Sequence, residues 1–331
     1  MSLRRLAMAF LPLVLLLGAC SSTEAQGSGL QVVTTVSPIT NIVENVGGDR
    51  VSVTGIVPEG TNSHTFEPAP SDAAVMEDAD IVFINGLHLE EPTLELAENN
   101  TGNGVPIVSL ADRTISEDEY IYDFSFPKAG GFPNPHLWTN PLYAKRYAEI
   151  VADELTKVDP EGADTFQANL DAYTERLDDL DAAVREATQT VPEADRKLLT
   201  YHDSFPYFAR EYGWRVIGAV QPSDFAEPTP QDVAALIDQI RDEHIPAIFG
   251  SEVFPSPVLE QISAETGANY VDDLRDDDLP GDPGDADHSY LGLMVFDFRT
   301  IVGALGGDPS AFDSVDISNL PADGATDMTR Y

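Results

Sequence analysis

Short runs of β-branched and aliphatic residues alternate with helical patterns along most of the chain. Runs of this kind occupy residues 31–36, 51–57, 80–85 and 106–110 in the first half, and residues 197–202, 215–220, 247–252 and 269–274 in the second. Strands that alternate with helices are typical of a parallel α/β architecture. Four strands in each half therefore predict two similar lobes, each a four-stranded, mostly parallel sheet flanked by helices.

The middle of the chain, residues 141–194, has no strand pattern and is predicted to be helical. Its apolar residues recur every three or four positions, at Phe166, Leu170, Tyr173, Leu177, Leu180 and Val184. This spacing places them along one face of an otherwise charged helix. A helix of about 28 residues would be about 40 Å long, enough to join the two lobes as a rigid strut. The alternative is one long core helix inside a single domain.

The first twenty residues have the pattern of an export signal. Arg4 and Arg5 precede an apolar run, residues 6–17, and small residues then lead to Cys20, the only cysteine of the chain. The run is short for a membrane-spanning helix, and LGAC is similar to a bacterial lipobox, which implies cleavage before Cys20 and its lipidation. The alternative is an ordinary secretory signal with an incidental cysteine. We therefore expect five segments: a signal peptide (1–20), a flexible tether (21–30), an N-terminal lobe (31–140), a helical region (141–194) and a C-terminal lobe (195–331).

The composition is strongly acidic. Asp and Glu number 57 against 18 Lys and Arg, which gives a formal net charge of −39. Nucleic acids and anionic lipid surfaces attract basic patches, so this charge argues against nucleic-acid binding and gives the body of the protein no electrostatic attraction to a membrane. A surface rich in carboxylates also favours a high-salt environment, in which self-repulsion is screened.

Three of the six histidines occupy positions where open α/β sheets bind ligands. His64 follows the second predicted strand in SHTFEPAPSD, His136 precedes a helix in FPNPHLWTNP, and His202 ends the fifth predicted strand in KLLTYHDSF. Such folds bind ligands beyond the carboxyl ends of their strands. Asp272, at the end of the last predicted strand, is the fourth candidate. Each residue alone is more often a hydrogen-bonded loop or cap residue, and spacing does not show that the four converge.

The other histidines and the longest acidic segment are interpreted as structural. His244 follows a charged helix end, where a cation interacts favourably with the helix dipole, and His88 and His288 are also taken as non-ligands. Residues 276–287, DDDLPGDPGDAD, have the composition of a solvated acidic loop and lack the register of an EF-hand. Whether His288 or Asp273 contributes to a site stays open.

Four segments in fixed order resemble the zinc and manganese receptor family of bacterial ABC importers. They are PEGTNSHTFEPAPSD, FPNPHLWTNP, the helix ADTFQANLDAYTERLDDLDAAV and TYHDSFPYFAREYGW. The similarity runs from about residue 30 to residue 306 and implies two four-stranded α/β lobes, joined by one long helix, with a divalent metal in the cleft between them. By the same resemblance the metal ligands are His64, His136, His202 and Asp272.

The resemblance also implies partners and a location. Receptors of this family deliver their metal to a membrane permease that works with an ATPase subunit. We therefore expect the chain to be a monomer, exported and anchored through the lipid on Cys20 to the outer face of the cell membrane.

Three imidazoles and one carboxylate form a four-coordinate set that suits zinc. Manganese and ferrous iron would accept the same residues, with a bidentate Asp272 that raises the coordination number. The chain also lacks the long histidine-rich loop that zinc-only relatives carry between the first two ligands, which favours manganese as the alternative. The Irving–Williams order makes zinc bind at least as tightly as manganese in vitro. We expect zinc as the first candidate cargo and manganese as the second.

Two other functions compete with metal capture. A hydrolytic zinc centre typically keeps an open position for water beside three protein ligands, and a glutamate acts as base. The sequence contains neither HExxH nor GxSxG. Four protein ligands close the site and predict a receptor, not an enzyme, unless Asp272 stands off and water replaces it. An anchored surface adhesin whose metal is structural is the remaining hypothesis.

Overall fold

The computed structural model describes residues 29–223, 225–253, 257–272 and 274–320. Cys20, the predicted signal peptide and residues 21–28 of the predicted tether lie outside the described residues. Within the described ranges, no helix combines the length and the apolar character that crossing a membrane requires.

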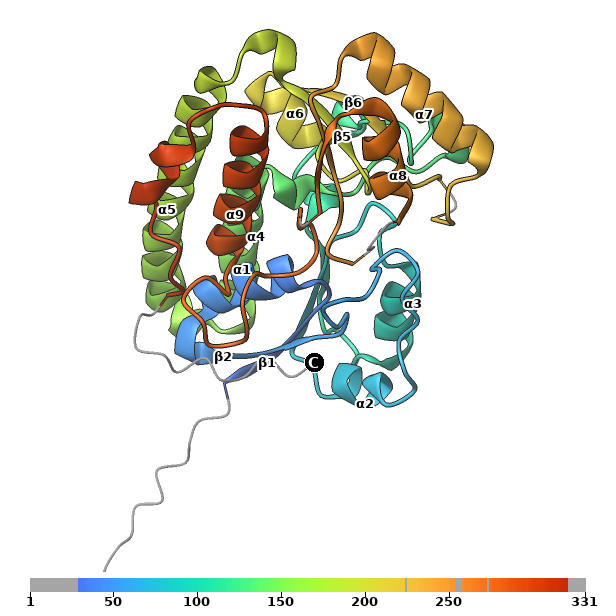
Figure 1. Ribbon diagram of the computed structural model, residues 1–331. Helices are drawn as coiled ribbons and strands as arrows, with labels where there is room; N and C mark the ends of the chain where they lie inside the picture. The colour runs from blue at the N-terminus through green and yellow to red at the C-terminus, as the bar shows by residue number, and fades with distance from the viewer. Residues whose placement is uncertain (1–28, 224, 254–256, 273, 321–331) are drawn as a thin grey trace, which may run out of the picture.

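The first sheet consists of four parallel strands in the order β2-β1-β3-β4. These are β1 (Leu30–Thr34), β2 (Val51–Gly55), β3 (Ile81–Ile84) and β4 (Ile107–Ser109). Neighbouring residues of a strand point to opposite faces, and Val32 and Val33 accordingly belong to different hydrophobic clusters. Helix α1 (Ser37–Gly47) packs on one face, and α2 (Asp72–Glu77) and α3 (Glu91–Asn100) lie on the other (Figure 1).

The second sheet repeats this arrangement in the order β6-β5-β7-β8, again with parallel strands. Its strands are β5 (Lys197–Thr200), β6 (Arg215–Ala219), β7 (Ala247–Phe249) and β8 (Asn269–Val271). Helix α6 (Pro206–Tyr212) shares a hydrophobic cluster with Leu198, whereas α7 (Pro230–Glu243) and α8 (Pro257–Thr266) share another with Leu199. All eight predicted strands are present, and the prediction of two similar α/β lobes is confirmed.

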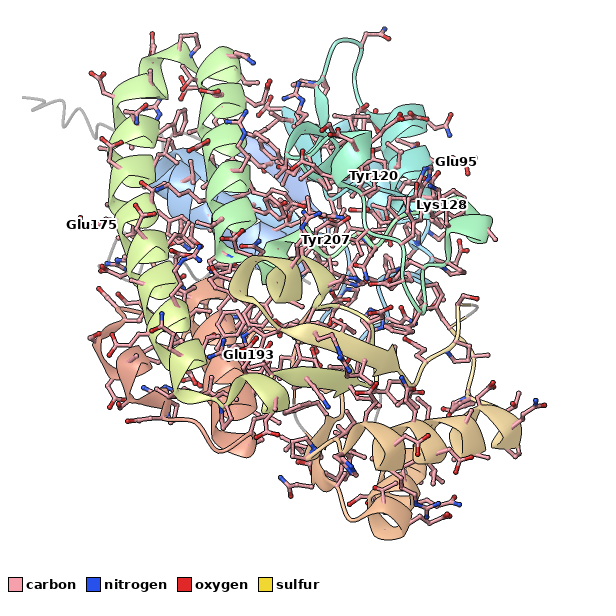
Figure 2. The ribbon with its side chains drawn as sticks, turned by 90° about the horizontal axis from the view of Figure 1, so that it is seen from above. Glu95, Tyr120, Lys128, Glu175, Glu193 and Tyr207 are labelled. Carbon is pink, nitrogen blue, oxygen red and sulfur yellow. The ribbon has the colours of Figure 1, made fainter. Side chains whose placement is uncertain are left out.

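A long helix joins the lobes. Helix α5 (Ala163–Thr190) has 28 residues, and it contacts α1 of the first lobe and α6 of the second. Its apolar stripe faces inward, with Phe166, Tyr173 and Leu177 buried, while Glu175 lies on the outward face (Figure 2). At about 1.5 Å per residue the helix spans about 40 Å, so the predicted strut is confirmed.

Two further helices lie beside α5 (Figure 1). Helix α4 (Pro141–Val158) precedes it, and α9 (Tyr290–Ala304), the last α-helix described, returns to pack against α5 and α1. The short 3₁₀ helices are η1 (Gly48–Arg50), η2 (Ala111–Arg113), η3 (Glu117–Glu119), η4 (Lys128–Gly130), η5 (Leu137–Thr139), η6 (Pro160–Gly162), η7 (Glu193–Asp195) and η8 (Pro309–Ser314). One hydrophobic cluster includes residues of α1, α4, α5 and α9 and of strands in both sheets. This shared core holds the two lobes against a common support.

Candidate metal centre

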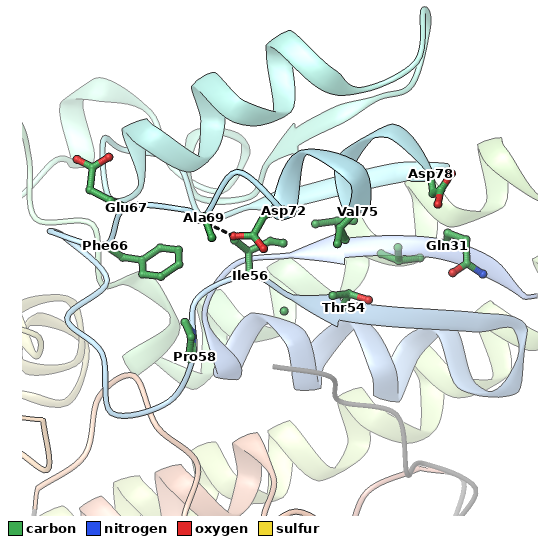
Figure 3. Close-up of a pocket in the computed structure, with 13 residues that line it drawn as sticks. Gln31, Thr54, Ile56, Pro58, Phe66, Glu67, Ala69, Asp72, Val75 and Asp78 are labelled. Atoms are coloured by element: carbon green, nitrogen blue, oxygen red, sulfur yellow. Dashed lines mark hydrogen bonds between the residues drawn. The ribbon is translucent and has the colours of Figure 1, made fainter.

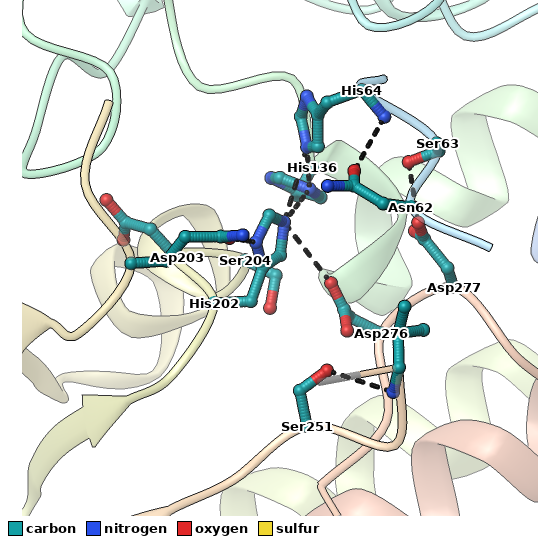
Figure 4. A network of polar contacts seen from close by, with 12 residues as sticks. Asn62, Ser63, His64, His136, His202, Asp203, Ser204, Ser251, Asp276 and Asp277 are labelled. Carbon is teal, nitrogen blue, oxygen red and sulfur yellow. Dashed lines mark hydrogen bonds and ion pairs between the residues drawn. The ribbon is translucent and has the colours of Figure 1, made fainter. Parts of the chain in front are cut away.

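The three candidate histidines meet between the two sheets. His64 lies in the loop after β2, His136 directly precedes η5, and His202 lies two residues after β5. The His136 and His202 Nε2 atoms are 2.9 Å apart, and the His64 Nε2 lies 3.2 Å from the first and 3.3 Å from the second (Figure 4). Three imidazole nitrogens from segments far apart in the sequence therefore point at one place.

Burial keeps these imidazoles neutral. The His136 and His202 side chains are buried, and His64 is half-buried. Removal from water lowers the pKa of His202 to about 4, and it lowers the pKa values of His64 and His136 well below the usual range, with a further contribution from the neighbouring His202. Near pH 7 all three imidazoles are therefore neutral and do not carry the second proton that would prevent metal binding.

Hydrogen bonds to amide side chains determine which ring nitrogen carries the proton. The His136 Nδ1–H donates to Asn134 Oδ1 at 2.8 Å, and the His202 Nδ1–H donates to Gln221 Oε1 at 2.6 Å. In a neutral imidazole the other nitrogen is then a hydrogen-bond acceptor. Two such acceptors that face each other at 2.9 Å repel, and a cation between them removes that repulsion. The arrangement fits a metal ion.

Both first-lobe histidines follow an asparagine by two positions. The His64 backbone N–H donates to Asn62 Oδ1 at 3.0 Å, and the His136 backbone N–H donates to Asn134 Oδ1 at 3.1 Å. This local turn, in which an asparagine side chain takes the place of a backbone carbonyl, fixes the loop that presents each imidazole. The repeated Asn-x-His pattern in NSH and NPH is a further sequence signal for the site, beyond the positions of the histidines relative to strands and helices.

The structure does not bring Asp272 to the histidines. Its side chain is exposed, one residue after β8 ends, and it belongs to neither group of side chains, within the described ranges, that could hold a metal. The chain first runs past the buried Leu274, whose carbonyl accepts the Glu252 N–H at 3.2 Å, and turns inward only beyond Arg275, whose N–H donates to Asp297 Oδ1 at 2.9 Å. A different aspartate, four residues later in the chain, lies close to the histidines.

That residue is Asp276. Its Oδ2 atom lies 3.4 Å from His202 Nε2 (Figure 4). Its carbonyl accepts the Trp138 Nε1–H at 2.8 Å, and its N–H donates to Glu252 Oε1 at 3.0 Å. The side chain is buried, although the segment 276–287 was expected to be a solvated loop. Only the later part of that segment, residues 281–287, is exposed.

Asp277 and Asp278 connect the second lobe to the loop that carries His64. The Ser63 hydroxyl donates to Asp277 Oδ2 at 2.6 Å, and the Gly60 N–H donates to Asp278 Oδ2 at 2.7 Å. Burial raises the pKa of each carboxyl to about 7, with a contribution from the negative charge of Glu252. Asp276 and Asp277 also come within reach of His136 as a second group that could hold a metal. A bound cation would offset this concentration of buried negative charge.

The remaining histidines lie outside these groups. His88 is exposed, and its Nδ1–H donates to Glu91 Oε1 at 2.6 Å, whereas His244 ends α7 in a left-handed conformation. His288 is buried, with its Nδ1 3.3 Å from the Pro280 carbonyl. The structure thus places none of the three with the candidate ligands, and Asp273 lies outside the described residues.

Two pockets differ in their relation to the histidines. A pocket of about 300 Å³ reaches His64 and is lined by residues of both lobes, including Phe126, Phe132 and Phe225. The Phe225 ring stacks on the His64 imidazole, with ring centroids 4.4 Å apart. A larger pocket of about 580 Å³ lies between β2 and α2 and is lined by residues such as Thr54 and Asp72 (Figure 3). None of its lining residues belongs to the histidine cluster, so of these two pockets the smaller one reaches the metal centre.

Comparison with known proteins gives one family and a consistent set of relatives. A sequence model of the family described as "Zinc-uptake complex component A periplasmic" (ZnuA) matches residues 32–304. The manganese-binding lipoprotein MntA of Halalkalibacterium halodurans is 30% identical over 285 residues, which cover 86% of this chain and 91% of that protein. The iron-binding protein YfeA of Yersinia pestis is 31% identical over 278 residues, 83% of this chain and 86% of that protein.

The fold has solved counterparts. The periplasmic zinc-binding protein TroA from Treponema pallidum superposes with a TM-score of 0.76 at 29% identity, over 84% of this chain and 99% of that one. Several streptococcal relatives are described as metal ABC transporter substrate-binding lipoproteins. The names of these relatives refer to manganese, iron and zinc.

Proposed function

This chain belongs to the family of periplasmic zinc-uptake components, and on that premise we propose that it captures a divalent transition metal between its two lobes and delivers it to the permease of an ABC importer. The relatives support a substrate-binding role in transport and not an enzymatic one. The three Nε2 atoms that lie within 3.3 Å of one another, two of them with the proton held on Nδ1, carry the proposal.

The proposed ligands are His64 and His136 from the first lobe and His202 and Asp276 from the second. Each lobe supplies two of the four, so a bound ion closes the cleft by holding the lobes together. Three imidazoles and one carboxylate form a complete four-coordinate set for zinc. Zinc is the first candidate cargo, because by the Irving–Williams order it binds such a site at least as tightly as manganese.

Manganese is the second candidate, and Asp277 favours it. This aspartate lies within reach of His136 and Asp276, so the centre can offer a second carboxylate. Manganese accepts oxygen ligands and higher coordination numbers more readily than zinc does. MntA, described as manganese-binding, is similar to this chain over most of its length.

A hydrolytic zinc centre would need an open position for water. A site without Asp272 would favour a hydrolytic centre, and Asp272 does lie away from the histidines. Asp276, however, supplies a carboxylate in its place. Four protein donors therefore remain, and we infer a closed site built for capture.

Anchoring and delivery complete the proposal. Lipidation of Cys20 would hold the chain at the outer face of the cell membrane, beside the permease and its ATPase subunit, and a single copy of the chain contains every proposed ligand. Several relatives are named lipoproteins of metal ABC transporters. Mass spectrometry of the chain expressed with its N-terminus in a bacterial host tests the anchor, since an unmodified Cys20 would contradict it.

Metal binding is tested by isothermal titration of the soluble chain from residue 21 onward with zinc and with manganese. We expect one ion per chain for the wild type and an affinity lower by orders of magnitude for His136→Ala. His244→Asn is the matched control, because that residue lies at the end of α7 and asparagine tolerates its left-handed backbone. Equal affinities of the wild type and His136→Ala would refute the site.

A further inference from the structure

We propose that two buried amides, Gln221 and Asn134, are positioning residues that set the metal affinity of this centre by holding His202 and His136 with uncharged acceptors. The inference rests on the proposed function, because it concerns the same metal centre. It assigns a role to side chains that touch the ligands and not the metal.

Gln221 is held in place by its own backbone. It lies two residues after β6, is almost completely buried, and its N–H donates to the Tyr201 carbonyl at 2.9 Å. Its carbonyl accepts the Ser125 hydroxyl of the first lobe at 2.7 Å. With the main chain fixed on both sides, the side-chain oxygen reaches His202 Nδ1 at 2.6 Å. The His202 ring therefore has one preferred orientation before metal arrives.

Asn134 holds His136 and at the same time contacts the second lobe. Its Oδ1 accepts both the backbone N–H and the ring Nδ1–H of His136, while its Nδ2 donates to the Asp203 carbonyl at 2.6 Å. The donation to a carbonyl fixes which end of the amide is the oxygen. Its backbone carbonyl also accepts the Tyr207 hydroxyl at 2.9 Å. Asn134 thus fixes His136 relative to the residue that follows His202.

The chemical type of these two partners is unusual for this chain. Carboxylates outnumber every other polar class in the sequence, with 57 Asp and Glu residues, and metal-bound histidines commonly donate to a carboxylate. Asp203, adjacent to His202, instead accepts the Ser125 N–H at 3.0 Å. A carboxylate partner makes an imidazole a stronger metal ligand, whereas an amide orients the ring without that increase. The amides preorganise the centre yet limit its affinity, which suits a receptor that must release its cargo.

Replacement of Gln221 separates this role from simple support of the fold. We expect Gln221→Ala to lower zinc affinity by about 10- to 100-fold, because the ring loses its orientation. We expect Gln221→Glu to raise it by about tenfold, because the orientation is kept and the acceptor becomes charged. Gln189→Glu, on the exposed face of α5, adds the same charge far from the centre and should leave the affinity unchanged. Competition against a chromophoric zinc chelator at pH 8 measures all four proteins.

Gln221→Ala and Gln221→Glu change the zinc affinity in opposite directions only if the inference holds. A fall in affinity for Gln221→Glu that matches the fall for Gln221→Ala would show a merely structural role and overturn it. No change in either variant, with normal zinc binding by the wild type, would overturn it as well and leave the proposed function standing. A wild-type protein that binds neither zinc nor manganese would refute the proposed function itself.

A measurement on the wild type keeps the inference testable if Gln221→Glu does not fold. Long-range ¹H–¹⁵N spectra of the metal-free protein report which nitrogen of each histidine carries the proton. We expect His136 and His202 to be protonated on Nδ1 with unprotonated Nε2 atoms. A proton on Nε2 of either ring would overturn the assignment of the amide oxygens as acceptors.

Discussion

The two lobes contribute to the metal centre in different ways. The first lobe supplies His64 and His136, neutral imidazoles presented by two Asn-x-His turns. The second supplies one imidazole, His202, and a group of buried carboxyls that begins with Asp276. One lobe therefore offers preformed neutral ligands, and the other offers negative charge that is costly to bury without a cation. The difference indicates that a bound ion stabilises the second lobe more than the first.

The largest effect is expected from removal of the carboxylate that is proposed as the second lobe's metal ligand. Asp276→Ala should weaken zinc binding roughly 100-fold or more, because it deletes a charged ligand that a divalent ion needs. Asp272→Ala is the matched control, since that side chain is exposed and lies outside the cluster. Isothermal titration measures the two variants beside the wild type. A loss of affinity in Asp272→Ala with none in Asp276→Ala would reverse the assignment.

Acidification should weaken binding through the carboxyls of the second lobe. Burial raises the pKa of Asp277 to about 7 and that of Asp276 well above its usual range, whereas it lowers the pKa of His202 to about 4. A carboxyl must lose its proton to attract the metal, so affinity should decrease by up to about tenfold per pH unit below 7, while the imidazoles stay neutral. Chelator competition at pH 8, 7 and 6 measures this dependence. A constant affinity over this range would show that the carboxyls take no part.

A smaller effect is expected from cutting one connection between the lobes. Ser63→Ala removes the hydroxyl that donates to Asp277 Oδ2 across the cleft. A hydrogen bond to a charged acceptor is worth about 1.5 kcal/mol or more, so the closed state should lose about tenfold in population and zinc affinity should fall by up to that factor. Ser71→Ala, in an exposed loop of the same lobe, serves as the control in the same titration. Equal affinities of both variants would show that this bond does not help to close the cleft.

The smallest effect on affinity, with a larger effect on stability, is expected at Asp278. Burial raises the pKa of this carboxyl to about 7, above the unfolded value, so the stability it contributes is present below about pH 4 and is lost as pH rises through 7. Asp278→Asn keeps an acceptor for the Gly60 N–H and removes the charge. The metal-free variant should unfold with a free energy up to about 4 kcal/mol higher than the wild type at pH 8 and no higher at pH 4.

Denaturant unfolding at the two pH values measures this change, with Asp282→Asn, in the exposed part of the same loop, as control. Zinc affinity should fall only about twofold, because Asp278 is not among the proposed ligands and acts on the ion through its charge at a distance. A variant less stable than the wild type at pH 8 would show that the buried charge is already compensated.

Local patterns predicted the architecture because they depend on neighbouring residues. Eight apolar runs became the eight described strands, and the stripe from Phe166 to Val184 became the buried face of α5. The three histidines could be singled out because they follow strands or begin helices, where α/β folds bind ligands. The prediction that the three histidines converge, however, rested on the resemblance to a family and not on their spacing in the sequence.

The fourth proposed ligand could not be predicted because its position depends on contacts between distant segments. Five aspartates follow the last strand in VDDLRDDDL. Their spacing in the sequence does not indicate which of them would bind a metal. The choice of Asp276 depends on Leu274, on Glu252 and on Trp138, which guide the loop into the cleft. Gln221 has no local signal at all, since it reaches His202 only through the pairing of β5 with β6.

Anomalous diffraction at the zinc edge, from crystals of the zinc-loaded chain, tests the central claim most directly. We expect one strong peak per chain, bonded to the Nε2 atoms of His64, His136 and His202 and to the Asp276 carboxylate. A peak that lacks a ligand from either lobe, or that lies away from these residues, would contradict the account.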